Sequence, residues 1–331
     1  MSRPRWEVAD VIRLFGEKLE QSRPLTRHVR RALDDMAACR TAALGGHVDG
    51  CDACGSLRLS YNSCGNRNCG KCQGVEREAW ILGREQDLLP VVYYHVVFTI
   101  AAQLNSLCLY NPRAMYGLLF EAAWRTLQVF ARDEKHLGGA TGATMVLHTW
   151  GQNLGLHPHV HAIVPGGGLT GDGKWQKARS RSDRFLFPVK ALSRVFRAIF
   201  LKKVLLPLEN GELALPDEAH FQDGKAYRKW RNALYQKPWV VYAKRPFGGP
   251  KQVLEYLGRY THKTAISNHP PPARKDRKQL RAEAVQRLFK GEAPDRCPCC
   301  KTGRLQRIGL IPRQRAPPAG QMPNWVSCTA D

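Results

Sequence analysis

The run HPHVH places His157, His159 and His161 within five residues, directly ahead of a short apolar run and three glycines. If this run is a strand, the three imidazoles project to one face, because side chains alternate with period two. Neutral imidazole is a common metal ligand, and two imidazoles on one strand can bind the same ion. We therefore predict a metal clamp formed by His159 and His161. Gln152 and His157 are both candidates for a third ligand, and the residues alone do not choose between them.

The residues that follow the histidines limit the class of enzyme. Hydrolytic metal sites built on two histidines usually add an aspartate within a few residues, which completes a dinuclear centre. Here residues 162–165 read AIVP and contain no carboxylate. A metallohydrolase would also be indifferent to the tyrosines discussed next.

A second group of reactive side chains lies about a hundred residues later, in EYLGRYTHK. On a helix, Tyr256 and Tyr260 are four residues apart and emerge on the same face. A tyrosine hydroxyl can attack a phosphodiester when a cation polarises the phosphate. Arg259 and Lys263 lie beside this face and could hold phosphates. Two tyrosines on an amphipathic helix can equally pack into a core, so this pair needs support from elsewhere.

Four of the eleven cysteines form two knuckles, Cys51-x2-Cys54 and Cys69-x2-Cys72, separated by 14 residues. This spacing predicts one tetrahedral zinc with four thiolate ligands, and the intervening SLRLSYNS suits a β-hairpin. A site with four protein ligands has no open position, so the zinc is expected to be structural. It would fold a segment that is too small for a core of its own.

Other residues of this region could extend the zinc site or contact a partner. Cys39, His47 and Cys64 could bind a second zinc, but they supply only three ligands. The same region carries three basic residues that fit DNA contact or, equally, a solvated face: Arg58, Arg67 and Lys71.

The charge balance points to a polyanionic partner. Lys and Arg total 51 against 28 Asp and Glu, a formal charge of +23 that is spread along the whole chain. Such an excess favours a broad surface that faces DNA or RNA. No run approaches the roughly 20 apolar residues of a membrane span. The first residues read as an amphipathic helix without the apolar core of a secretory signal. We therefore expect a cytoplasmic protein, in which cysteines are metal ligands rather than disulfides.

Strand and helix patterns alternate irregularly and predict an α+β central domain. Runs rich in β-branched and aromatic residues predict strands at 91–100, 142–151, 157–165 and 239–247. Apolar residues at intervals of three and four predict helices at 114–133, 188–205 and 251–263.

Six motifs, in this order, resemble one known family. They are CRTAALGGH, CDACG, YNSCGNRNCGKCQ, YYHVVFTI, HPHVHAIVPGGG and KQVLEYLGRYTHKTAISN. The resemblance covers most of the chain and includes these motifs, and it is to the rolling-circle transposases of bacterial insertion sequences, specifically the insertion-sequence-ninety-one type. That family belongs to the His-hydrophobic-His endonuclease superfamily, which includes replication initiators and relaxases.

The resemblance implies a fold and an activity. The fold would be a small zinc-binding module followed by an antiparallel-sheet nuclease domain of ferredoxin-like or palm type, with helices on one face. His159 and His161 would hold catalytic Mg²⁺ or Mn²⁺, and Tyr256 and Tyr260 would be the nucleophiles. The partner would be single-stranded DNA or hairpin element ends, cut through a 5'-phosphotyrosine intermediate, and the protein could form homo-oligomers.

The resemblance also implies a division of the chain into segments. Residues 1–36 would be an amphipathic helical segment and residues 37–78 the zinc-binding domain. Residues 88–268 would be the nuclease domain, with a helical insertion at about 170–237, and residues 269–331 a basic, Pro-rich and partly disordered segment.

Two departures from the family pattern keep an alternative open. Asn68 stands where the family usually has histidine, and Gly70 stands where it has proline. After TAISN the chain is shorter than the family pattern. Its half-knuckle Cys297-x2-Cys300 has only Cys299 and Cys328 as poor complements, which does not favour a C-terminal zinc. The alternative is a zinc-dependent DNA-binding protein derived from such a transposase, with an inactive or truncated nuclease.

Overall fold

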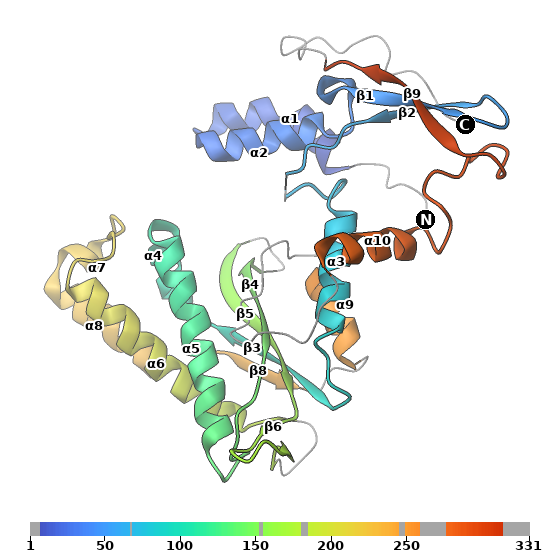
Figure 1. Cartoon of the computed structure of the whole chain (residues 1–331). Coiled ribbons are helices and arrows are strands. Elements are labelled where there is room, and N and C mark those ends of the chain that lie inside the picture. Colours follow the sequence, from blue (N-terminus) through green and yellow to red (C-terminus); the bar gives the residue numbers. More distant parts are fainter. Residues whose placement is uncertain are drawn as a thin grey trace. The chain divides into compact units, whose positions relative to one another are not determined.

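The computed structural model describes residues 7–66, 68–151, 155–179, 185–244, 249–258 and 276–313. The chain forms two compact units, each of which is described by itself (Figure 1). The terminal unit combines Met1–Trp80 with Lys275–Asp331, and the central unit is Ile81–Arg274. The central unit is thus inserted between the two parts of the terminal unit along the sequence.

The central unit is built on a four-stranded antiparallel sheet of order β4-β5-β3-β8. The strands are β3 (Tyr93–Thr99), β4 (Thr144–Trp150), β5 (Leu156–Pro165) and β8 (Val241–Lys244). All four strand predictions are confirmed. β-branched and aromatic residues dominate these runs, as expected for a sheet with at least one buried face.

Two long helices cover one face of this sheet. They are α5 (Pro112–Arg132) and α6 (Val189–Glu209), which pack together and against β5 and β8 (Figure 1). Val96, Val160 and Ala162 point into this core and are fully buried. The segment expected to be a helical insertion therefore contributes α6 to the core. The predicted α+β class, with helices on one face of an antiparallel sheet, is confirmed.

Shorter elements complete the central unit. The helices are η2 (Ala102–Leu104), α4 (Asn105–Tyr110), α7 (Ala219–Gln222), α8 (Gly224–Gln236) and α9 (Gly249–Gly258), and β6 (Gly167–Leu169) pairs with β7 (Trp175–Lys177). Helix α9 packs against β3.

The terminal unit contains a three-stranded antiparallel sheet of order β2-β1-β9. Its strands are β1 (Gly46–Cys51), β2 (Leu57–Tyr61) and β9 (Leu305–Ile311), so the outer strand comes from the far end of the sequence. The predicted hairpin within 56–63 is wrong, because that run forms the single strand β2 and pairs with β1. The helices are α1 (Val8–Ser22), α2 (Arg27–Ala38), η1 (Ala42–Leu44), α3 (Gly74–Glu85), which crosses the unit boundary, and α10 (Arg277–Leu288).

None of the helices within the described ranges is long and apolar enough to cross a membrane.

Phe196 on α6 provides a test of how the helices hold the sheet. Its ring lies 5.0 Å from that of Phe98 on β3 and 5.6 Å from that of Trp239, and it has no exposed surface. We expect Phe196→Ala to lower the free energy of unfolding by about 3–5 kcal/mol, because it leaves a cavity in the core. Urea denaturation measures this loss. Val240→Ala, at an exposed position beside β8, should change stability by less than about 0.5 kcal/mol. Equal losses in the two variants would contradict this account of the core.

Candidate metal centre and cysteine clusters

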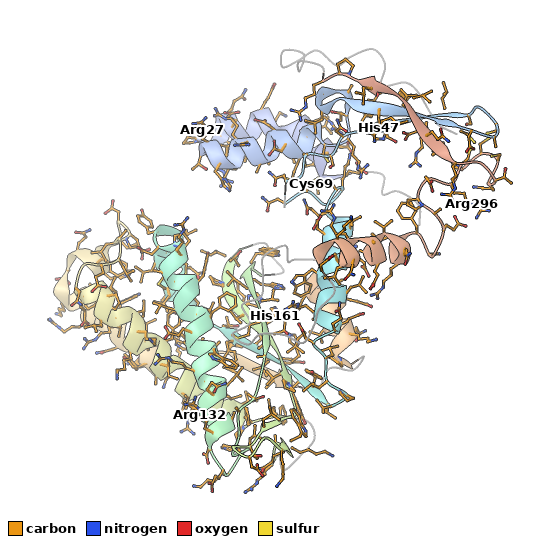
Figure 2. All side chains as sticks on the ribbon, in the orientation of Figure 1. Arg27, His47, Cys69, Arg132, His161 and Arg296 are labelled. Atoms are coloured by element: carbon orange, nitrogen blue, oxygen red, sulfur yellow. The ribbon has the colours of Figure 1, made fainter. Side chains whose placement is uncertain are left out.

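Three histidines gather on the face of the central sheet opposite α5 and α6. They are His148 on β4 and His159 and His161 on β5, and their ligand atoms all lie within 4.8 Å of one another. The strand register sets this arrangement, since His148 pairs directly with His159 and the period of two brings His161 to the same face. His148 and His161 are only 4% and 6% exposed. Figure 2 labels His161 on the sheet.

The structure brings together the two histidines predicted as a clamp but adds a different third residue. His157 is exposed and outside the cluster. It contributes its backbone oxygen, which lies 2.6 Å from His159 Nδ1. Gln152, the other candidate, lies outside the described residues. His148 was missed because its position opposite His159 depends on the register of β4 and β5, which no local pattern in MVLHTW reveals.

A fourth histidine contacts the cluster from the neighbouring strand β3. His95 on β3 places Nε2 2.7 Å from His161 Nδ1, and the two rings stack with centroids 5.0 Å apart. With Nδ1 of both His159 and His161 engaged, Nε2 is the nitrogen that each ring can offer to an ion. Partners of this kind fix the tautomer and orientation of metal-binding histidines. Sequence analysis also missed this role, although His95 stands out as a polar residue within VVYYHVVFTI.

Burial keeps these imidazoles neutral. It lowers the pKa of His148 and of His95 to about 4, and that of His161 to about 2, with neighbouring imidazoles adding to the shift for His148 and His161. The pKa of His159 is also lowered by burial. Only a neutral imidazole has a lone pair for a metal ion. The donor set therefore fits a divalent cation at neutral pH without first losing protons.

Helix α9 carries the first residue of the predicted tyrosine pair. Val253, Leu254 and Leu257 are buried, and the helix packs against β3, which also carries His95. Tyr256 lies within α9, but its side chain lies outside the described part of the structure. Arg259, Tyr260 and Lys263 also lie outside the described residues. Their roles remain predictions.

The cysteines of the terminal unit form two clusters rather than one. The first contains Cys39, Cys64, Cys69 and Cys72, with ligand atoms all within 4.8 Å of one another. The sulfurs of Cys64 and Cys72 are 3.8 Å apart. A tetrahedral zinc with Zn–S bonds of about 2.3 Å separates its sulfurs by about 3.8 Å, so the cluster has the dimensions of a zinc site.

The predicted grouping of Cys51 and Cys54 with Cys69 and Cys72 is wrong, because β1 and β2 separate the two knuckles. Cys51 ends β1, whereas the chain returns along β2 to the opposite end of the strand pair before reaching Cys64. Five residue steps along β1 span about 17 Å. At that opposite end, the backbone N–H of Arg40 donates to the oxygen of Asn62, which brings Cys39 close to Cys64.

Cys51 and Cys54 instead cluster with Cys297 and Cys300, again with ligand atoms all within 4.8 Å of one another. Hydrogen bonds from the Thr302 side chain and from the backbone N–H groups of Gly303 and Thr302 lower the pKa of Cys300 to about 5, which favours the thiolate. The expectation that the C-terminal half-knuckle lacks complements is therefore wrong. Its complement is the N-terminal knuckle, and Cys54 and Cys297 lie 243 residues apart in the sequence.

The remaining predicted residues of this unit have other surroundings. His47 is not in either cluster, and its Nε2 lies 3.4 Å from Asp49 Oδ2. Arg58 is exposed on β2. Lys71 forms an ion pair with Glu7. Arg67 lies outside the described residues.

Comparisons with known proteins identify the family of this chain. Residues 11–100 match the IS91 family described as "Transposase zinc-binding domain", and residues 142–276 match a family described as "Putative transposase". The chain is 44% identical over 272 residues to "Putative transposase y4qJ" of Sinorhizobium fredii, covering 81% of this chain and 68% of that protein. The chain belongs to the IS91-type transposases. It is also 30% identical over 235 residues to the transposase for insertion sequence element IS801 of Pseudomonas savastanoi pv. phaseolicola, covering 70% of this chain and 54% of that protein.

Solved structures give a weaker comparison for this IS91-type chain. The conjugative relaxase TrwC in complex with oriT DNA is 19% identical, with 60% of this chain and 74% of the relaxase covered, at a TM-score of 0.27. A TM-score this low does not establish a common fold.

The contact between His95 and His161 predicts a loss of metal affinity in this IS91-type transposase. We expect His95→Ala to weaken Mn²⁺ binding about 10- to 100-fold, because the ring of His161 loses the partner that orients it. Calorimetric titration of Mn²⁺ into the zinc-loaded full chain measures this effect. His157→Ala is the matched control, since the bond to His159 uses its backbone oxygen. Wild-type affinity in His95→Ala, or an equal loss in both variants, would contradict the orienting role.

Proposed function

We propose that this transposase nicks and rejoins single-stranded DNA, with Tyr256 and Tyr260 as nucleophiles and a divalent cation held by His148, His159 and His161. The cluster of three neutral imidazoles is the observation that carries the proposal. Its position adds support, because the sheet face that bears it is opposite the helical core and α9, which includes Tyr256, packs against a strand of the same sheet.

The ligands suggest which cation the site prefers. A divalent ion bound there would polarise the scissile phosphate and stabilise the charge that develops on the leaving oxygen. Imidazole nitrogen suits first-row transition ions, whereas Mg²⁺ prefers oxygen ligands in octahedral geometry. We therefore favour Mn²⁺ over Mg²⁺ at this site.

Each cleavage step conserves the number of phosphoester bonds. The phenolic oxygen of one tyrosine gives up its proton and attacks the phosphorus, forming a bond between tyrosine and the 5'-phosphate. The bond from phosphorus to the 3'-oxygen breaks, and that oxygen leaves as a free 3'-hydroxyl after taking up a proton. Attack by a 3'-hydroxyl on the phosphotyrosine reverses the step and rejoins DNA. A second tyrosine allows a second strand to be cut while the first remains attached.

Basic residues would hold the DNA backbone. The net charge of +23 supports extensive phosphate contact. Arg259 and Lys263 follow Tyr256 closely in sequence, and we propose that they bind phosphates beside the reacting group. In the terminal unit, exposed Arg58 is a better candidate than Lys71, whose charge is already paired with Glu7. Arg67 stays a candidate DNA contact.

Trapping the covalent intermediate tests the proposal. The full chain is incubated with Mn²⁺ and a library of single-stranded DNA hairpins, labelled at either the 3' or the 5' end. We expect the 3' label to migrate with denatured protein and the 5' label to appear on a released fragment that a polymerase can extend. The double variant Tyr256→Phe, Tyr260→Phe should give no adduct, while His157→Ala should give wild-type yield.

Two outcomes would contradict this chemistry. DNA binding without any adduct in Mn²⁺ or Mg²⁺ would favour the zinc-dependent DNA-binding protein with an inactive nuclease. Cleavage that persists in the double tyrosine variant would favour metal-dependent hydrolysis.

The choice of metal gives a separate prediction. At equal concentrations, we expect Mn²⁺ to bind more tightly and support a higher adduct yield than Mg²⁺. Removing one ligand by His148→Ala should lower both the Mn²⁺ affinity and the yield. Titration calorimetry and the adduct assay measure the two effects. Equal adduct yields with the two ions, or Mn²⁺ binding unaffected in His148→Ala, would contradict the assignment of these ligands.

A further inference from the structure

The cluster of Cys51, Cys54, Cys297 and Cys300 joins two distant parts of the sequence. The sulfurs of Cys51 and Cys300 are 3.8 Å apart, as are those of Cys54 and Cys297. These separations equal the edge of a ZnS₄ tetrahedron, about 3.8 Å, and are far longer than the roughly 2 Å of a disulfide. All four are free cysteines.

The two knuckles have matching backbone geometry. The backbone oxygen of Cys51 accepts from the N–H of Gly55 at 3.0 Å, and that of Cys297 accepts from the N–H of Lys301 at 3.1 Å. Each turn ends on a left-handed residue, Gly55 at φ 69° and Lys301 at φ 61°. A lysine in this conformation carries a steric cost that the surrounding structure must offset. The matched turns present both cysteines of each pair to one point.

Direct contacts hold the knuckles against each other. The backbone N–H of Asp52 donates to the oxygen of Arg304 at 3.1 Å, and the N–H of Arg304 donates to Asp52 Oδ1 at 2.7 Å. Gly303 approaches so closely that a Cβ there would lie 2.4 Å from Cys51 Sγ. The close packing therefore requires glycine at this position.

Beyond the knuckles, strand β9 pairs with β1 from Cys51 opposite Leu305 to Gly46 opposite Ile311. Hydrophobic burial contributes little to this docking, because Ile308 and Leu310 are 62% and 77% exposed. The backbone hydrogen bonds between β9 and β1 replace hydrogen bonds to water, so their net contribution to stability is small. The docking of β9 therefore requires a further source of stability.

We propose that Cys51, Cys54, Cys297 and Cys300 bind a second structural zinc. This ion would hold strand β9 against the paired strands β1 and β2 and so stabilise the sheet of the terminal unit. Neither family match reaches Cys297, since the later one ends at residue 276. The ion brings together residues on both sides of the inserted central unit. Closed coordination by four thiolates gives it a structural role, independent of the proposed strand cleavage.

Metal analysis of matched variants tests the site. We expect about two zinc ions per full chain in the wild type and about one in the double variant Cys297→Ser, Cys300→Ser. Cys299→Ser is the matched control, because this exposed cysteine lies in the same knuckle but outside the cluster, and it should retain two. Only one zinc in the wild type, two in the double variant, a loss in Cys299→Ser, or iron in place of zinc would overturn the assignment.

Hydrogen exchange separately tests the role of the zinc in holding β9. In the double variant, amides of β9 and their partners on β1 should lose protection at least tenfold, while amides of α5 and α6 should keep wild-type protection and report an intact central unit. Unchanged protection of β9 after loss of one zinc would overturn the role of the zinc in holding β9.

Gly303→Ala tests the close packing of the two knuckles while keeping all four ligands. We expect weaker protection of the β9 amides, because the added Cβ collides with Cys51. Wild-type protection in this variant would contradict the close packing.

Discussion

Strand β5 places apolar side chains against the helices on one face of the sheet and imidazoles on the other face. The architecture of the central unit depends on this alternation. Val160, Ala162 and Val164 face the helices and are fully buried, while His159 and His161 face the other way. A shift of one residue in register would put imidazoles against α5 and valines in the candidate metal site. The apolar packing of α5 and α6 thus fixes the histidines before any ion binds, which preorganises the centre.

The terminal unit is stabilised by different means. Leu57 and Leu59 on β2 are largely exposed, as are Ile308 and Leu310 on β9, so its sheet has little hydrophobic core. A cysteine cluster lies beyond each end of the strand pair β1 and β2 instead. Metal coordination can supply the folding free energy that a small segment cannot obtain from burial. Loss of either proposed zinc should therefore affect this unit far more than the central sheet.

Sequence patterns predicted the features that are set by residues close together in the sequence, such as the positions of helices and the two faces of a strand. The alternation in HPHVHAIVP correctly places His159 and His161 on the face of β5 opposite Val160 and Ala162, and apolar spacing located α5 and α6. Contacts between distant segments were beyond such patterns. Strand register brings His148 into the cluster and His95 into contact with His161, and the Cys54–Cys297 contact joins positions 243 residues apart. Knuckle spacing indicated the cysteines of the N-terminal region as candidate ligands but not which of them cluster together, because equal spacing permits several pairings.

The separation between Cys54 and Cys297 also imposes an order on biosynthesis. The first cluster is complete once Cys72 has been made, so it can take up zinc while the chain is still short. The second waits until both Cys297 and Cys300 have been made, and Cys297 already lies 243 residues after Cys54, about 10–50 s at typical elongation rates. During that interval Cys51 and Cys54 lack their two partners and would be open to oxidation or to a wrong metal. With the proposed zinc at this cluster, maturation of the terminal unit would therefore depend on the zinc supply after Cys300 has been made.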